Sequence, residues 1–308
     1  MRTPSISPGT PTLLTGLASR LCKLCLLTLS HARFLHGIDL PRILTDHTGT
    51  SLNLPGTLSF FPTRPTDQDT LAALIRRLHP VRCNKDLIRL GPDEDGGYLV
   101  PDDLHGIVAC FSPGVSTLVG FERACAQLGM RVFMADASIE HPPDVHPQFE
   151  FIKRFVGSTT DRDFISLEEW VNASNVDPHA DLLLQMDIEG GEYETLLSIP
   201  KDLQMRFRII VVEFHHLHYL FSDPLFSIYS KALEKLLSTH SCVHIHPNNV
   251  RRAVRVGTLE IPQIAEFTFL RNDRISHPSF PLQFPHPLDR DNVPNAPLYL
   301  PQCWYRTQ

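Results

Sequence analysis

Short apolar runs alternate with segments of helical periodicity from residue 106 onward, and this alternation restricts the chain to few folds. Strands that alternate with helices form right-handed βαβ units, so the sequence predicts an α/β fold with a Rossmann-like, seven-stranded, mostly parallel sheet and helices on both faces. No helical pattern separates the last two runs, and we expect them to pair antiparallel at the sheet edge. The expected strands are 107–111, 131–135, 149–156, 181–186, 207–214, 242–246 and 266–270. The expected helices are 118–128, an opening at 166–171, the segment after 192, and 224–237.

The 26 prolines crowd toward both ends of the 308-residue chain. Residues 1–65 therefore read as an irregular leader, and residues 66–308 as the main domain with a Pro-rich wrap from about residue 271. A helix capped by Thr66 or Asp67 is expected to open this domain and to run through Leu78. Between this helix and the first strand, Asp95-Gly96-Gly97 predicts a tight turn between two short strands.

Residues 1–38 contain no acidic residue, a composition that also fits an organelle transit peptide. Residues 13–35 are compatible with a basic amphipathic helix on a membrane surface, with a packed helix, or with a disordered leader. The seven cysteines form no disulfide framework, which favours a reducing, cytoplasmic location, with organelle targeting as the alternative. No apolar run reaches 18 residues, so no membrane span is expected, and a net charge of -6 argues against a nucleic-acid partner.

The stretch from Met186 to Glu194 reads Met-Asp-Ile-Glu-Gly-Gly-Glu-Tyr-Glu and joins an apolar run to a helical segment. In an open α/β sheet, ligands bind beyond the carboxyl ends of the strands, which is where we expect Asp187 and Glu189. The two glycines permit a sharp turn, and Glu192 falls in the first helical turn, where negative charge suits the helix dipole. The alternative is that these acids only cap the helix.

A second strand–turn–helix unit contains Gly114 in its turn, and the next strand ends at Asp136, 22 residues further on. An acid in this position accepts hydrogen bonds from ribose hydroxyls in nucleoside-binding folds. The turn, Phe-Ser-Pro-Gly-Val-Ser, lacks the second glycine of the dinucleotide fingerprint, so a plain strand-to-helix turn stays open as the alternative.

Several short motifs agree in order and spacing with one family. They are Arg89-Leu-Gly with Asp95-Gly-Gly-Tyr98, Cys110-Phe-Ser-Pro-Gly114, Ala135-Asp136, Met186 to Tyr193, Val212-Glu-Phe-His215, His246-Pro-Asn-Asn249, and Ile261-Pro with Glu266. Across about residues 85–300 the chain resembles the FkbM-like methyltransferases, whose class I fold has seven strands with a helix after each of the first five. The chain departs from this pattern at Ser112-Pro113, where family members often have a Gly-rich segment. Residues 1 to about 65 lie outside this resemblance.

The resemblance implies methyl transfer from S-adenosylmethionine, usually to an oxygen of a sugar or another small hydroxyl compound. Alternatives are another nucleotide-using α/β enzyme, such as a sugar-nucleotide transferase or a dehydrogenase, and a non-catalytic relative. Asp187 with Glu213 and a histidine has metal-ligand chemistry, but no tight ligand spacing is present, so a divalent metal stays open as an alternative that is not favoured. The oligomeric state and the acceptor stay open.

The predicted site residues come from the ends of neighbouring strands. His215 is the first candidate for a base, because a neutral imidazole operates near pH 7. The expected catalytic residues are Asp187, Glu189, Glu213 and His215; the cofactor-binding residues are Ser112, Gly114, Asp136 and Asp187; the substrate-binding residues are Asp95, Tyr98, His246, Asn248 and Asn249.

Overall fold

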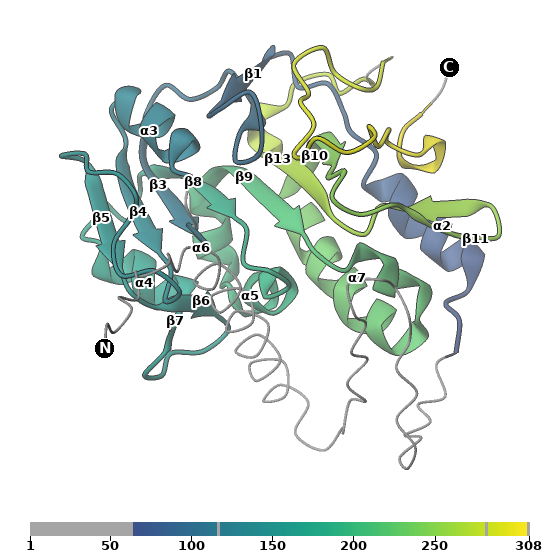
Figure 1. The fold of residues 1–308 in the computed structure, drawn as a ribbon, viewed down its shortest axis with the longest axis horizontal. Helices are drawn as coiled ribbons and strands as arrows, with labels where there is room; N and C mark the ends of the chain where they lie inside the picture. Colours follow the sequence, from purple (N-terminus) through teal and green to yellow (C-terminus); the bar gives the residue numbers. More distant parts are fainter. Residues whose placement is uncertain (1–63, 116–117, 281–282, 307–308) are drawn as a thin grey trace, which may run out of the picture. The chain divides into compact units, whose positions relative to one another are not determined.

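The computed structural model describes residues 64–115, 118–280 and 283–306 (Figure 1). The expected leader, residues 1–65, and the expected amphipathic segment, residues 13–35, lie wholly or almost wholly outside these residues and remain predictions. The first described helix, α2 (Gln68–Arg77), begins where the sequence predicts it, with the Asp67 side chain accepting a hydrogen bond from the amide of Thr70.

A seven-stranded sheet forms the centre of the described chain, in the order β10-β13-β9-β8-β3-β4-β5. Its strands are β3 (Ile107–Pro113), β4 (Arg131–Ala135), β5 (Phe149–Ile152), β8 (Asp181–Met186), β9 (Phe207–Phe214), β10 (His240–Pro247) and β13 (Ala265–Arg271). β13 runs antiparallel to both of its neighbours, β9 and β10, while β9, β8, β3, β4 and β5 pair in parallel. The predicted mostly parallel α/β fold with an antiparallel pair at one edge is therefore confirmed.

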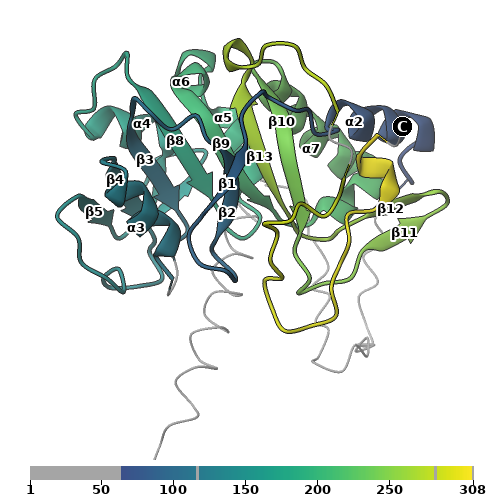
Figure 2. The same cartoon turned by 90° about the horizontal axis from the view of Figure 1, so that it is seen from above.

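The two faces of the sheet are covered by different elements (Figure 2). Apolar side chains of α2, α4 (Leu167–Ala173), α5 (Glu192–Ser198) and α7 (Asp223–Leu237) share one core with one face. On the other face, α3 (Gly120–Gln127) packs together with a hairpin of β1 (Leu87–Leu90) and β2 (Tyr98–Pro101). We call this second side the hairpin face. Alternating residues of each strand point to it, among them Leu183 in β8 and Val211 in β9.

Two sequence expectations are wrong in detail. The expected strand 149–156 ends at Ile152, and Phe155–Gly157 forms β6, which leaves the main sheet to pair with β7 (Phe164–Ser166). Lys153 and Arg154 interrupt the apolar run at this point. In addition, no helix follows β4: residues 136–148 are non-helical, because Pro142, Pro143 and Pro147 cannot supply the amide protons of a helix interior.

The remaining elements complete the framework around the sheet. They are α6 (Lys201–Arg206), the β11 (Val254–Val256) and β12 (Leu259–Ile261) hairpin, and the short 3-10 helices η1 (Leu217–Phe221), η2 (Asn272–Arg274) and η3 (Gln302–Trp304). The Pro-rich C-terminal segment is anchored by Trp304, which is fully buried and whose indole nitrogen donates to the carbonyl of Glu260 at 2.9 Å.

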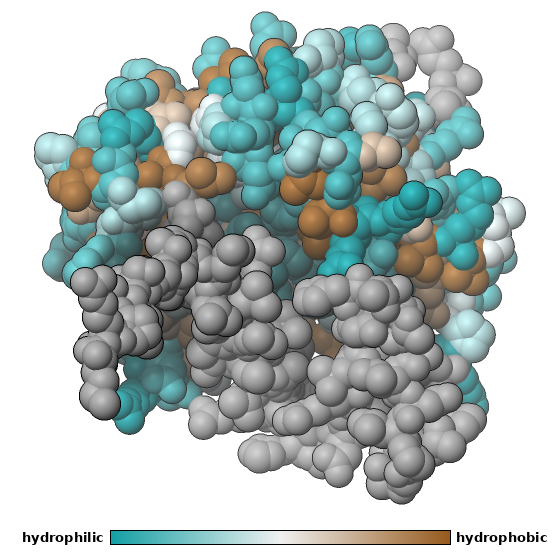
Figure 3. Space-filling model, in the orientation of Figure 1, coloured by the Kyte–Doolittle hydropathy of each residue, from teal (hydrophilic) through white to brown (hydrophobic). Residues whose placement is uncertain are grey.

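Hydrophobic residues on the face shown in Figure 3 form several separate groups among hydrophilic ones. The most exposed large apolar side chains, Val145, Tyr299 and Leu128, come from distant parts of the sequence. Within the described residues, no helix combines the length and hydrophobicity needed to cross a membrane.

Candidate functional site

Ionisable side chains line the carboxyl edge of the sheet on the hairpin face. Asp187 follows β8 directly, and the register Met186–Val212 places it level with Glu213 at the end of β9. Glu213 lies opposite Glu266 of β13, which in turn lies opposite His246 of β10. The sequence predicted that Asp187, Glu213 and His246 end neighbouring strands, and the registers bring them to one level. Glu266 belongs to the same row, although it was identified only as part of a motif.

The backbone after β8 is folded tightly. Glu189 and Gly190 have positive φ angles of 58° and 109°, so the chain reverses direction within two residues. Gly114 has a φ of 93°, and a Cβ atom there would lie 1.6 Å from the carbonyl oxygen of Asp187. The missing side chain of Gly114 therefore makes room for the Asp187 backbone, whereas we expected it to admit a ligand.

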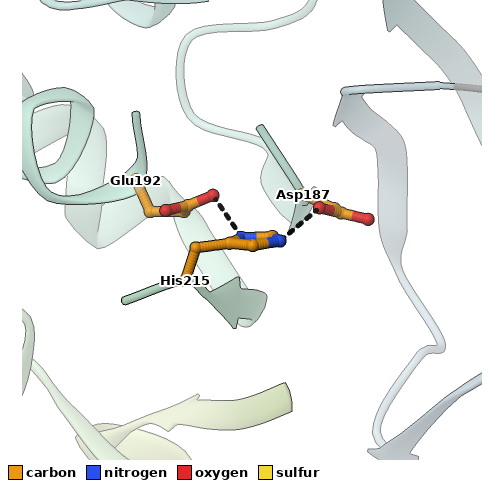
Figure 4. A group of neighbouring side chains, drawn as sticks. All are labelled: Asp187, Glu192 and His215. Carbon is orange, nitrogen blue, oxygen red and sulfur yellow. Dashed lines mark hydrogen bonds and ion pairs between the residues drawn. The ribbon is translucent and has the colours of Figure 1, made fainter. Parts of the chain in front are cut away.

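Glu192 holds this turn together from the inside. It is fully buried, and its Oε1 accepts hydrogen bonds from the amides of Ile188 (3.1 Å) and Gly190 (3.0 Å). The same oxygen lies 3.1 Å from Nδ1 of His215 (Figure 4). Helix α5 is preceded by Gly191 and has no side-chain cap, so Asp187 and Glu189 do not cap it. The capping alternative is therefore wrong.

His215 lies between acidic groups on both sides of its ring. Nδ1 faces Glu192, while Nε2 lies 3.9 Å from Oδ1 of Asp187 and 3.6 Å from Oε2 of Glu189. Burial alone would lower the pKa of His215, but the charge and hydrogen bond of Glu192 outweigh it and raise this pKa well above its ordinary value. Burial likewise would raise the pKa of Glu192, but His215 lowers it. The two groups therefore form an ion pair in the free protein.

The carboxylate of Asp187 is less well satisfied than that of Glu192. Its Oδ1 is enclosed and has no hydrogen-bond partner among the described residues, although 31% of the side chain is exposed. Burial, countered by His215 and reinforced by Glu189, raises the pKa of Asp187 to about 7. A carboxylate that lacks a strong donor is available to a ligand.

Asn248 and Asn292 hold the two glutamates of the row. Asn248 donates to Oε1 of Glu213 at 2.7 Å, and Asn292 donates to Oε1 of Glu266 at 2.7 Å and to Oδ1 of Asp95 at 3.0 Å. Burial raises the pKa of both glutamates, that of Glu213 strongly. Asn292 was missed because it lies in the Pro-rich C-terminal segment, where the sequence gives no periodic signal.

His246 is buried at the far end of the row, and its Nδ1 lies 3.7 Å from Oδ2 of Asp289. Burial alone would lower the pKa of His246, but Asp289 and Glu266 raise it.

Three predicted site residues have their polar atoms engaged elsewhere. Ser112 is fully buried, with its hydroxyl 2.5 Å from Glu122 and 2.6 Å from Gln185, so it does not face the cofactor turn as we expected. The side-chain amide of Asn249 donates to the carbonyl of Val293 and accepts from the amide of Val293, and these two hydrogen bonds hold the C-terminal segment. Asp136 lies at the end of β4 as predicted, and its Oδ1 accepts from the amide of Ser138 at 2.6 Å.

Asp187, Glu192 and His215 are also the group whose ligand atoms lie close enough to hold a metal ion, within 4.8 Å of one another. The sequence suggested Glu213 in place of Glu192. Glu192 already accepts three hydrogen bonds with one oxygen, so its geometry is that of a carboxylate that orients a histidine.

The strand order reverses between β3 and β8, and acidic side chains gather at the carboxyl edge beside this point. These features define a Rossmann-like α/β fold, and in open sheets of this kind ligands bind at the topological switch point. Residues 135–242 match the family model described as the methyltransferase FkbM domain. The resemblance seen in the sequence is confirmed.

Solved structures give a weaker likeness. A crystal structure from Anabaena variabilis ATCC 29413, assigned to a methyltransferase of an antibiotic biosynthesis pathway, is 14% identical with a TM-score of 0.27. The match covers 46% of this chain and 60% of that protein. No curated protein matches the sequence.

Proposed function

We propose that this methyltransferase uses S-adenosylmethionine and methylates a hydroxyl group of a small molecule, with carbohydrates as the expected class of acceptor. The observation that supports this best is the charge of the carboxyl edge. The carboxyl groups of Asp187, Glu189 and Glu192 lie within 3.9 Å of the ring nitrogens of His215, and Glu213 adds a fourth carboxyl group at the level of Asp187. Such an edge attracts a cation and repels phosphate groups. It therefore favours a sulfonium cofactor over the anionic cofactors of dehydrogenases and sugar-nucleotide transferases.

Residues on the β3–β4 side fit the nucleoside part of such a cofactor. Asp136 ends β4, only one of its carboxylate oxygens is used within the described residues, and it lies beside the turn that follows β3. We assign it to the ribose hydroxyls, and we assign the turn at Gly114 to the cofactor through its backbone. The bound cofactor supplies a methyl group on a positively charged sulfur. The protein then has to align the acceptor and take its proton.

His215 is the residue we assign as the base. Glu192 keeps a proton on Nδ1, so that Nε2 faces the edge where Asp187 and Glu189 lie. Because the acidic surroundings raise the pKa of His215, the imidazole is protonated in the free protein at neutral pH. A cation bound at the same edge lowers this pKa and releases Nε2 to accept the proton of the acceptor. Asp187 then stabilises the imidazolium that forms.

Ligand binding tests the proposal directly. The melting temperature of the full chain is measured with S-adenosylmethionine, S-adenosylhomocysteine, NAD and UDP-glucose in turn. We expect a rise with the first two only. A rise with NAD or UDP-glucose alone would favour the other nucleotide-using enzymes, and no rise with any of the four would favour a non-catalytic relative.

Replacing Asp136 with alanine tests the cofactor assignment separately. Loss of a hydrogen-bonded carboxylate should weaken the binding of S-adenosylmethionine by about 1–3 kcal/mol. Calorimetry on the folded variant measures this, with circular dichroism as the check of folding. Unchanged affinity would remove Asp136 from the cofactor site.

A further inference from the structure

A chain of buried hydrogen bonds crosses the hairpin face beside the acidic edge. It begins at Glu122 of α3, passes through Ser112 of β3 and Gln185 of β8, and ends at the hydroxyl of Tyr98 in β2. The three contacts measure 2.5, 2.6 and 3.2 Å in this order. None of the four side chains is more than 5% exposed, and each comes from a different element. Water therefore takes little part in the chain.

The protons of this chain can be counted. The hydroxyl of Ser112 carries one proton but lies within hydrogen-bond distance of two acceptor oxygens, Oε1 of Glu122 and Oε1 of Gln185. Either Glu122 is neutral and donates to Ser112, or the amide of Gln185 is turned round and Glu122 is ionised. The hydrogen bonds of the two arrangements are donated in opposite directions along the chain. Only in the first arrangement does Tyr98 donate no hydrogen bond to another member of the chain.

The surroundings of Glu122 favour the neutral form. It is 5% exposed, and none of the described salt bridges involves it. Burial raises the pKa of Glu122. An ionised carboxylate buried without a cation is costly, whereas a neutral carboxyl can donate to Ser112. Ser112 then donates to Gln185, and Gln185 donates to Tyr98.

This direction leaves Tyr98 with a free proton close to Asp187. Gln185 lies in β8 and Asp187 directly follows the strand, so the alternation of side chains places both on the same side, and the Tyr98 hydroxyl accepts a hydrogen bond from Gln185. Among the described residues, the Tyr98 hydroxyl accepts this hydrogen bond and donates none. Of the neighbouring charges, that of Asp187 has the largest effect on the pKa of Tyr98. Oδ1 of Asp187 is itself enclosed and without a donor among the described residues. An unused donor and an unused acceptor therefore lie near each other at the edge.

We propose that Tyr98 and Asp187 together bind one hydroxyl group of the acceptor: Tyr98 donates a hydrogen bond to its oxygen, and Asp187 accepts the hydrogen bond that the hydroxyl donates. Glu122, Ser112 and Gln185 are positioning residues that fix the direction of the chain and so keep the Tyr98 proton available. This inference rests on the proposed function. It specifies a neutral hydroxyl group as the ligand. A carboxylate would be repelled by Asp187, and an ammonium group has no lone pair that could accept the hydrogen bond of Tyr98.

The direction of the chain is tested without any ligand. The infrared difference spectrum between the wild-type protein and Glu122→Gln is recorded at neutral pH, and we expect it to contain the carbonyl stretch of a neutral carboxylic acid. The amide that this substitution introduces can donate to Ser112 as a neutral Glu122 does, so the variant should keep the wild-type melting temperature within a few degrees. A carboxylate band in the difference spectrum, or a variant that does not fold, would overturn the proposal.

The role of Tyr98 is tested with Tyr98→Phe, with Tyr299→Phe at an exposed tyrosine as the matched control. S-adenosylhomocysteine formation is followed with a panel of methyl glycosides as hydroxyl probes, and cofactor affinity is measured by calorimetry. Tyr98→Phe should raise KM for the glycoside about tenfold, the value of one hydrogen bond, with cofactor affinity unchanged. Unchanged KM and kcat would remove Tyr98 from the acceptor site.

If the wild-type protein neither binds S-adenosylmethionine nor forms S-adenosylhomocysteine, the proposed function fails, and the acceptor role of Tyr98 fails with it. The infrared result still decides the direction of the hydrogen-bond chain in that case.

Discussion

Two aspartates bracket β8, and their surroundings are opposite. Asp181, at the amino end, accepts hydrogen bonds from Arg208 (2.6 and 2.8 Å) and Arg271 (2.5 Å). Asp187, just beyond the carboxyl end, has no arginine or lysine partner among the described residues and an enclosed oxygen without a donor. Burial alone would raise the pKa of both. The arginines reverse the effect at Asp181 and lower its pKa, whereas the pKa of Asp187 rises to about 7.

We interpret this difference as one between a structural end of the sheet and an end that we propose to be functional. At the amino end, charges are paired with opposite charges: Arg208 also donates to the carbonyls of Asp103 and His105, and Arg274 pairs with Asp103. At the carboxyl end, carboxyl groups lie beside one another and raise each other's pKa values. Such unpaired charge costs stability, and folded proteins retain it where a ligand or a reaction needs it.

Replacing each aspartate with asparagine separates the two roles, and the largest effect is expected on the activity of Asp187→Asn. This change keeps the shape of the side chain and removes its charge. We expect turnover to fall about 100-fold or more, close to 3 kcal/mol of barrier, with an unchanged or higher melting temperature. Turnover is measured as S-adenosylhomocysteine formation beside a thermal melt. Wild-type turnover with a lowered melting temperature would mean that Asp187 is structural like Asp181.

Asp181→Asn should have the opposite effect. It leaves the two guanidinium groups of Arg208 and Arg271, both little exposed, without their shared carboxylate. Breaking such a pair should lower the free energy of unfolding by about 3 kcal/mol. Turnover of the folded fraction should stay at the wild-type level. Chemical denaturation measures the first quantity, and a large loss of turnover in fully folded protein would contradict the contrast between the two ends.

The sequence predicts the two ends of β8 unequally well. The apolar runs place β8 and β9 with the bounds that the structure gives, and the position of Asp187 beyond a strand indicates a site. The function of Glu192 is not visible, because it depends on a histidine 23 residues later in the chain and on full burial. The contact of Tyr98 with Gln185 joins residues 87 positions apart. Helix and strand periodicity carries no information on such distant pairs.

Glu192→Gln should sharpen the assignment at the carboxyl end. The neutral amide can still accept from Nδ1 of His215, but it no longer raises the pKa of His215. As a base, His215 acts when deprotonated, so the wild-type rate should rise with pH through the range above the ordinary histidine pKa of 6.5. In Glu192→Gln this rise of the rate should occur at lower pH, and the maximal rate should fall about tenfold. The measurement is kcat as a function of pH. If kcat of the variant rises over the same pH range as that of the wild-type protein, His215 is excluded as the titrating base.

The pH dependence of stability should also distinguish the two aspartates, because its sign differs between them. The folded-state pKa of Asp187 lies near 7, above the ordinary value of 3.8, so the folded protein binds this proton more tightly than the unfolded chain does. Ionisation of Asp187 therefore costs stability as the pH rises from about 4 to 7. For Asp181 the folded-state pKa is lowered, so its contribution is present above about pH 4 and is lost as the pH falls further. Relative to Asp187→Asn, the wild-type protein should lose stability between about pH 4 and pH 8; relative to Asp181→Asn, it should lose stability between about pH 5 and pH 3. Denaturant unfolding of the three proteins across this pH range measures both differences. If the free energies of unfolding of the wild-type protein and of Asp187→Asn change in parallel above about pH 4, Asp187 has an ordinary pKa and the contrast between the two ends of β8 is absent.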